Sequence, residues 1–191
     1  MPTGWSKIAR RIRVPLGFVF AAFFLWLARP SAPYLALSLL LVVPGIWLRA
    51  YASGYVKKNT EVTTTGPYAY TRNPLYLGSM LIAFGFALGA RSPWIALALA
   101  VLFAVIYIPV IRSEEAFLHS QFPDYGAYAD RVPRLIPRLR PARTTSAESG
   151  AFSAALYRKH REYNALIGSA AIYAALILKL CLWRFFQFPL R

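Results

Sequence analysis

The sequence predicts an all-α, polytopic integral membrane protein, a bundle of about five transmembrane helices with a further helix at the cytosolic membrane face. Its 191 residues are 58% hydrophobic and only 15% charged, whereas soluble domains are about half apolar and about a quarter charged. The charged residues also divide the chain into apolar runs close to the roughly 20 residues that cross a bilayer as a helix. Membrane-spanning helices therefore explain the excess of apolar residues better than a small soluble core does.

Five apolar runs give the predicted transmembrane helices in chain order. They cover residues 14–28, 30–48, 73–90, 92–111 and about 163–183. The first run has 15 residues and follows a basic stretch, as in a signal peptide, but Pro33 directly after a cleavage point at Ala32 disfavours cleavage. We therefore expect an uncleaved, short first helix. Lys179 interrupts the last run, and its long side chain is expected to reach the membrane interface.

The basic residues are concentrated on one side of these predicted helices. With the N-terminus in the cytoplasm, 17 of the 22 Lys and Arg residues fall in cytoplasmic segments, as the positive-inside rule predicts. They are Lys7, Arg10, Arg11, Arg13, Arg49, Lys57, Lys58, Arg72, Arg112, Arg131, Arg134, Arg138, Arg140, Arg143, Arg158, Lys159 and Arg161. Topology and attraction to anionic lipid headgroups explain most of the formal net charge of +15, so nucleic acid is not needed as a partner.

Few residues are available for a disulfide or a metal site. Cys181 is the single cysteine, which excludes an intrachain disulfide, and His119 and His160 are far apart in the sequence, so we expect no bound metal. Residues 141–150 form a polar stretch without periodicity. We therefore divide the chain into a core at 1–140, a polar and basic linker at 141–161, and an additional C-terminal transmembrane helix at 162–191.

The first polar motif of the core, residues 66–78, reads GPYAYTRNPLYLG. Asn73 is a favoured N-cap and Pro74 is tolerated at the first helical position, so the third transmembrane helix is expected to begin at Pro74. The N-terminus of a helix holds a carboxylate or phosphate readily, and Arg72 adds a positive charge beside it. The alternative interpretation is an ordinary capped helix start, with Gly78, Gly85 and Gly89 serving helix packing.

The second polar motif, residues 112–139, follows the fourth predicted helix on the same side of the membrane. Glu114 and Glu115 are two of only seven acidic residues in the chain, and their adjacency indicates a cationic partner, although solvated carboxylates are common at helix ends. Apolar and aromatic residues then recur at spacings of three and four, which predicts an amphipathic helix at the bilayer surface, broken at Pro123. They are Leu118, Phe122, Tyr125, Tyr128 and Val132. Such a stripe is more often a membrane anchor than a binding site.

Together the two motifs suit a small zwitterionic ligand. S-adenosylmethionine presents a carboxylate, an ammonium and a sulfonium, and tyrosine faces attract a sulfonium through the ring quadrupole. Nucleotides also carry anions and polar edges, so charge matching leaves both ligand classes open.

The two motifs in this order, with one helical hairpin between them, resemble the isoprenylcysteine carboxyl methyltransferase family, and the related phospholipid N-methyltransferases share much of the pattern. The resemblance covers roughly residues 45–140. The matching residues are Gly66, Tyr68, Arg72, Pro74, Tyr76, Gly78, Glu114, Glu115, Leu118, Phe122, Tyr125, Tyr128, Pro133, Arg134 and Pro137. It implies a bacterial inner-membrane enzyme whose S-adenosylmethionine site faces the cytosol and whose lipophilic substrate, a small molecule or a lipidated group, arrives from the bilayer.

The resemblance also implies roles for individual residues. The cofactor would be held by Tyr70, Arg72, Asn73, Tyr76, Leu77, Gly78, Glu114 and Glu115. The substrate would meet Tyr125, Tyr128, Arg131 and Arg134, with Glu115 and Arg134 as the candidates for positioning the reacting groups. Many family members have His where this chain has Asn73, and residues 141–191 lie outside the pattern.

The implied reaction is in-line methyl transfer from S-adenosylmethionine to a lipophilic acceptor, with a carboxylate of an isoprenylcysteine-like or other lipid-like substrate as the first choice. A phospholipid amine is the alternative. Less favoured are an NADPH-dependent sterol-type reductase, which tends to have Glu where this chain has Ser79, and a non-catalytic membrane scaffold that binds no cofactor.

Overall fold

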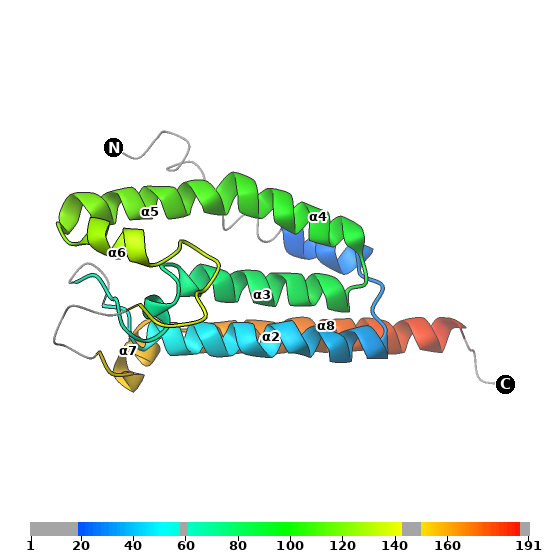
Figure 1. Cartoon of the computed structure of the whole chain (residues 1–191). Helices are drawn as coiled ribbons and strands as arrows, with labels where there is room; N and C mark the ends of the chain where they lie inside the picture. The colour runs from blue at the N-terminus through cyan, green and yellow to red at the C-terminus, as the bar shows by residue number, and fades with distance from the viewer. Residues whose placement is uncertain (1–18, 58–60, 143–149, 188–191) are drawn as a thin grey trace. The chain divides into compact units, whose positions relative to one another are not determined.

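A computed structural model describes residues 19–57, 61–142 and 150–187 of the chain, without the side chains of residues 184–187 (Figure 1). Within these ranges the chain forms helices and loops and no strand, which confirms the predicted all-α class. Several residues named above lie outside the described residues: Lys7, Arg10, Arg11, Arg13 and Lys58, together with residues 143–149 of the predicted linker.

The helices follow the predicted order closely. Residues 19–27 are helical. The further elements are α2 (Ala32–Ser53), η1 (Gly66–Ala69), α3 (Pro74–Gly89), α4 (Pro93–Leu102), the π-helical segment η2 (Phe103–Tyr107), α5 (Ile108–Gln121), α6 (Tyr125–Arg131), α7 (Ala154–Lys159) and α8 (Tyr163–Gln187). Pro74 begins α3 as predicted, because a proline has no N–H to leave unsatisfied in the first turn. α4, η2 and α5 continue into one another as a single rod (Figure 1).

Three of the described helices are long and apolar enough to cross a membrane: α2, the continuous helix Pro93–Gln121, and Tyr163–Trp183 of α8. They correspond to the second, fourth and fifth predicted spans. The third predicted span forms α3, which is apolar but has only 16 residues, fewer than the roughly 20 that cross a bilayer. The first is helical over residues 19–27 in its described part. The chain is thus an integral membrane protein by length and composition of its helices.

The chain divides into two compact units, which are described separately. One comprises Met1–Val43, Ile82–Val110 and Ile167–Arg191, and the other comprises Pro44–Leu81 and Ile111–Leu166. In the first unit, Ser38 of α2 hydrogen-bonds with the hydroxyl of Tyr173 of α8 at 2.6 Å, and the Tyr173 ring lies 5.0 Å from that of Phe86. Each long helix of the fold contributes residues to both units.

Lys179 of α8 has backbone partners in the first unit. Its ammonium donates hydrogen bonds to the backbone carbonyls of Leu25 and Trp26, at the C-terminal end of helix 19–27. The last carbonyls of a helix have no intrahelical partner and attract a cation. Within the first unit, Lys179 therefore caps the C-terminal end of helix 19–27, and its position at the membrane interface stays a prediction.

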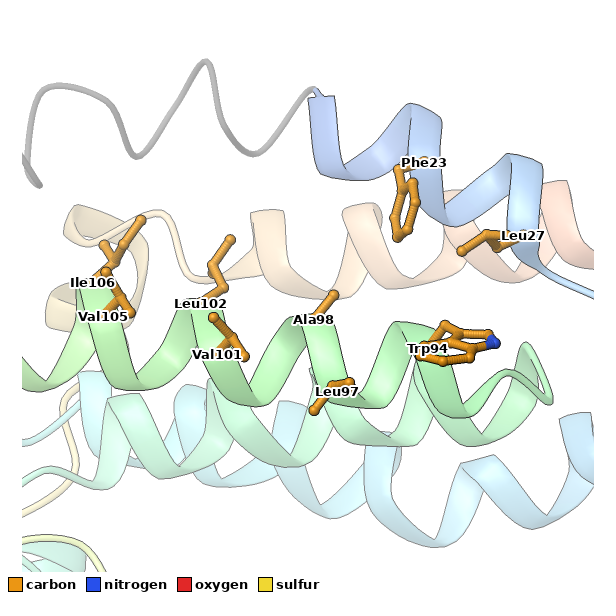
Figure 2. A pocket seen from close by; sticks show the side chains of 9 residues that line it. All are labelled: Phe23, Leu27, Trp94, Leu97, Ala98, Val101, Leu102, Val105 and Ile106. Atoms are coloured by element: carbon orange, nitrogen blue, oxygen red, sulfur yellow. The ribbon is translucent and has the colours of Figure 1, made fainter.

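A groove of about 700 Å³ in the first unit is lined by apolar side chains (Figure 2). Phe23 and Leu27 project into it from helix 19–27. The other lining residues come from α4 and η2: Trp94, Leu97, Ala98, Val101, Leu102, Val105 and Ile106. The described lining of the groove holds no charged side chain, and the two polar motifs of the sequence, residues 66–78 and 112–139, belong to the second unit.

The second unit is built around α6. Tyr125, Tyr128 and Val132 are buried, and Leu118 and Phe122 pack against them. The helical pattern breaks at Pro123, as predicted, because α5 ends at Gln121 and α6 begins at Tyr125. The prediction that the aromatic stripe anchors the chain in the membrane is wrong. Its residues form the core of this unit, because α6 folds back onto α5 and turns them toward each other.

Candidate functional site

Glu115 is the centre of a cluster that joins the two sequence motifs. Its side chain is 9% exposed. One carboxylate oxygen accepts a hydrogen bond from Asn73 Nδ2 at 3.1 Å and lies 3.6 Å from Arg72 Nη1, and the other accepts from Arg134 Nε at 2.8 Å. A buried carboxylate is costly unless it is paired and hydrogen-bonded, and here two guanidinium groups and an amide meet that need.

Backbone hydrogen bonds hold the two motifs side by side. Arg72 N donates to Pro133 O at 2.9 Å, and Arg138 N donates to the carbonyl of Tyr70 at 3.0 Å. The buried hydroxyl of Thr71 bonds to the carbonyls of Arg134 and Leu135 at 3.2 and 3.1 Å. The segment after α6 therefore runs along the segment before α3, and this pairing places Arg134 over Glu115.

Asn73 has two bonds that the N-cap prediction did not include. Its amide nitrogen donates to Glu115 and also to the carbonyl of Arg134 at 3.0 Å, while its own backbone carbonyl accepts the first helical bond of α3 from Leu77 N at 3.0 Å. An imidazole could offer only one N–H in that direction, whereas the amide donates twice. The departure from His at this position is thus compatible with a tightly bonded site.

Glu114 points elsewhere than Glu115, although the two are adjacent. The hydroxyl of Tyr76 donates to Glu114 at 3.1 Å from each carboxylate oxygen, and this contact is exposed. One acid is therefore buried between cations, and the other is solvent-accessible beside a phenol of α3. The two acids can take different roles.

Arg72 retains an unused donor. Its side chain is 14% exposed, and its Nε is a buried nitrogen without a hydrogen-bond partner among the described residues. Buried polar groups in native proteins nearly always find a partner. The Nε of Arg72 is therefore a buried hydrogen-bond donor beside Glu115 that has no partner in the described part of the chain.

The predicted substrate tyrosines lie in the core beside this cluster. The Tyr128 hydroxyl donates to the carbonyl of Tyr68 at 2.9 Å, and its ring makes an edge contact with Tyr125 at 5.9 Å. Burial raises the pKa of Tyr125, a shift that the charge of Glu115 increases and that of Arg72 opposes. Burial also raises the pKa of Tyr128 far above its ordinary value. Both phenols are therefore harder to deprotonate than an exposed tyrosine, which suits packing and hydrogen bonding.

Gly78 is placed by close helix packing. A Cβ at this position would lie 2.7 Å from Arg49 Cγ and 2.8 Å from the carbonyl oxygen of Gly45. Only glycine allows α3 to approach α2 this closely in the second unit. Its predicted contact with a cofactor stays a prediction, and its packing role accounts for the residue independently.

The remaining predicted residues lie at the edge of the cluster. Tyr70 has an exposed side chain and joins the site through its backbone carbonyl. Leu77 lies one turn into α3 and is half-buried. Arg131 Nε donates to Ala127 O of its own helix at 2.9 Å, and its carbonyl accepts from Arg138 Nη1 at 2.5 Å. These contacts direct Arg131 along α6.

Three polar residues of this unit were not among the predicted site residues. Arg49 forms a bidentate ion pair with Glu162, and it also donates to the hydroxyl of Ser79. The sequence indicated Arg49 only as part of the charge distribution, and Glu162 only as the first position of the predicted C-terminal transmembrane segment. The scarcity of acids that drew attention to Glu115 applies equally to Glu162, another of the seven.

The arrangement can bind a ligand that carries both charges. Arg72 and Arg134 share one buried carboxylate, so the cluster keeps a net positive charge for an anion, while Glu114 offers a carboxylate to a cation. Among the described residues, no group of three or more His, Cys, Asp or Glu could hold a metal ion.

Comparison with known proteins agrees with the motifs. Residues 33–125 match the phospholipid methyltransferase family. This range includes the first motif, Glu114 and Glu115, and ends before Arg134 and Glu162. No solved structure matches the chain.

Two curated relatives are similar over about half of the chain. The cobalt-zinc-cadmium resistance protein CzcN of Cupriavidus metallidurans is 40% identical over 100 residues, which are 52% of this chain and 45% of that protein. The nickel-cobalt-cadmium resistance protein NccN of Alcaligenes xylosoxydans xylosoxydans is 41% identical over 101 residues, or 53% of this chain and 46% of that protein. The similarity thus spans about half the length of the curated relatives.

Proposed function

We propose that the chain is an integral membrane enzyme that transfers a methyl group from S-adenosylmethionine to a lipophilic acceptor, because residues 33–125 match the phospholipid methyltransferase family. The observation that carries the proposal is the cluster of Glu115 with Arg72, Asn73 and Arg134. It joins the family's first motif to the segment after α6, and it contains the charges that this cofactor needs.

The residues of the cluster fit the cofactor on structural grounds. The orphaned Nε of Arg72 offers a buried donor to a carboxylate, and α3 begins beside it with the positive end of its dipole. Glu114 provides an accessible carboxylate for an ammonium or sulfonium. When bound, S-adenosylmethionine supplies an activated methyl group. The other residues predicted to bind the cofactor belong to the first turns of α3 or to the segment before it: Tyr70, Asn73, Tyr76, Leu77 and Gly78.

The chain's own contribution would be positioning and water exclusion. Holding two reactants in line can lower a barrier by up to roughly 7–11 kcal/mol in ideal cases. Glu115 fixes the side chain of Arg134, to which we assign the orientation of the reacting groups. The buried rings of Tyr125 and Tyr128 would exclude water from the adjacent side of the site. No deprotonated phenol or paired histidine is required for this chemistry.

Two acceptor classes are proposed. A carboxylate of an isoprenylcysteine-like lipid needs no general base, because it is already ionised at neutral pH. A phospholipid amine, which the family's name favours, must lose a proton first, and the exposed Glu114 is the candidate base. Both acceptors are lipophilic, in keeping with membrane helices on either side of the motifs.

The proposed location is a bacterial inner membrane with the N-terminus and the cofactor site in the cytoplasm, which follows from the charge distribution. The resistance to cobalt, nickel, zinc and cadmium named for the relatives would then depend, in this chain, on a modified membrane component. Direct binding of a metal ion would need free ligand atoms, whereas both carboxylate oxygens of Glu115 are paired with Asn73, Arg72 and Arg134.

Titration calorimetry of the detergent-purified protein with S-adenosylhomocysteine and, separately, NADPH tests the proposal. We expect binding of S-adenosylhomocysteine alone. Binding of NADPH alone would replace the methyltransferase with a reductase, and binding of neither would identify a scaffold. Methyl transfer from labelled S-adenosylmethionine to extracted lipids would then distinguish a carboxylate from an amine acceptor.

A further inference from the structure

The second half of the predicted linker is bonded to the C-terminal end of α2 at several points. Ser153 N donates to Gly54 O at 2.9 Å, and His160 Nδ1 lies 3.0 Å from Ser53 O. The ring of Phe152 stacks on that of Tyr51 at 6.1 Å and contacts Gly54 so closely that a Cβ there would clash with it. These contacts attach the start of the C-terminal extension to the end of α2.

Glu162 forms the strongest of these attachments. Both of its carboxylate oxygens bond to Arg49, with distances of 3.0 and 2.7 Å to Nη2 and 3.1 Å to Nε. The side chains are 12% and 23% exposed. Bidentate pairs of this kind are stronger and more directional than ordinary ion pairs, and partial burial protects them from screening.

The remaining nitrogen of the same guanidinium, Nη1, contacts the start of α3. Arg49 Nη1 donates to the carbonyl of Leu75 at 3.2 Å and to the hydroxyl of Ser79. Arg49 also packs against Gly78. Leu75, Gly78 and Ser79 belong to the first turns of α3, the same turns that carry Tyr76 and follow Asn73. Glu162 therefore acts on the candidate site through a single intermediate side chain.

We propose that Glu162 is a positioning residue of the cofactor site: it fixes the Arg49 guanidinium, which in turn holds the first turns of α3 in place. The inference rests on the proposed function. It extends the site beyond the matched residues 33–125, and it gives the C-terminal extension a role in ligand binding. The family segment by itself leaves Arg49 without its counter-charge, and an unpaired, half-buried guanidinium would hold α3 less firmly.

The test uses Glu162→Gln in the full-length, detergent-purified chain, because glutamine keeps the size of the side chain and removes its charge. Two quantities are measured: the Kd for S-adenosylhomocysteine, and hydrogen exchange of the peptide covering residues 74–81. We expect a Kd increase of about tenfold, the size of one charge-assisted hydrogen bond, together with faster exchange in that peptide. Glu162→Asp keeps the carboxylate and should restore most of both.

Glu61→Gln is the matched control, because it removes a carboxylate from an exposed ion pair with Lys57 in the same unit. It should change neither quantity, since exposed pairs contribute little. The double variant Arg49→Lys with Glu162→Gln should lose no more affinity than the more damaging single variant, because the two residues act as one unit.

The outcomes separate this inference from the proposed function. A wild-type protein that does not bind S-adenosylhomocysteine removes the proposed function, and exchange at residues 74–81 alone then decides whether Glu162 orders α3. If the wild type binds and Glu162→Gln binds equally well, Glu162 is no positioning residue, whatever the exchange shows. Equal losses in Glu162→Asp and Glu162→Gln would also overturn the inference.

Discussion

Glu115 illustrates how much a single residue decides in this chain. It is one acid among many bases, and its two oxygens hold three partners from segments on both sides of the hairpin. Removing its charge leaves two guanidinium groups without their shared counter-ion. The site loses its shape and its charge balance together.

The first prediction at this scale concerns the cluster. Glu115→Gln and Arg72→Ala should each weaken binding of S-adenosylhomocysteine by at least about tenfold, since each removes a charge-assisted contact. Titration calorimetry on the detergent-purified protein measures the effect, and the melting temperature shows that both variants fold. Unchanged affinity in both would remove the cofactor assignment from this cluster.

The second prediction concerns Gly78. Gly78→Ala should destabilise the protein by about 1–3 kcal/mol, the usual range for forcing extra volume into a packed contact, because a methyl group there meets Arg49 and the Gly45 carbonyl. Gly168→Ala in α8 is the control, with no atom within 4 Å of the added methyl, and should be neutral or slightly stabilising. Equal melting temperatures of the two variants would contradict the packing role.

At the scale of elements, the break between α5 and α6 determines what the aromatic residues do. A continuous amphipathic helix would have presented one stripe to the membrane. Because the helix stops before Pro123 and restarts at Tyr125, α6 returns onto α5 and buries the stripe. The same return brings the chain after α6 alongside the segment before α3.

The third prediction separates packing from ligand binding in α6. Tyr128→Phe should cost about 0.5–1.5 kcal/mol of stability, because the carbonyl of Tyr68 loses its buried partner. Its Kd for S-adenosylhomocysteine should stay within about twofold of the wild type. Chemical denaturation and calorimetry measure the two quantities, with the exposed Tyr163→Phe as control. A large loss of affinity at wild-type stability would instead place the Tyr128 hydroxyl in the ligand site.

At the scale of the whole molecule, the charge distribution predicts the orientation in the membrane. In a Cys181→Ser background, the variant Arg29→Cys should react with a membrane-impermeant maleimide on intact spheroplasts, because the segment between the first two helices is predicted to be external. The variant Glu61→Cys should react with the same maleimide only after the membrane is permeabilised. The opposite pattern would reverse the topology and place the site outside the cytoplasm.

The sequence by itself determined the elements of this protein. Apolar runs of bilayer length predict the long helices, Asn73-Pro74 predicts the start of α3, and Pro123 predicts the break after α5. These features depend on neighbouring residues, whose propensities and periodicity can be read directly from the chain. The residue types and order of the two polar motifs are also local features, and the first motif and the two adjacent acids of the second lie within the residues that match the phospholipid methyltransferase family.

Only the tertiary structure decided which side chains meet. Asn73 and Glu115 are 42 positions apart, and Arg49 and Glu162 are 113 positions apart, so no local pattern relates them. Gly78 permits the close approach of α3 to Arg49, and the return of α6 places Arg134 over Glu115. In a chain with 22 basic and seven acidic residues, many pairings satisfy charge, and only packing selects the cations that each carboxylate contacts.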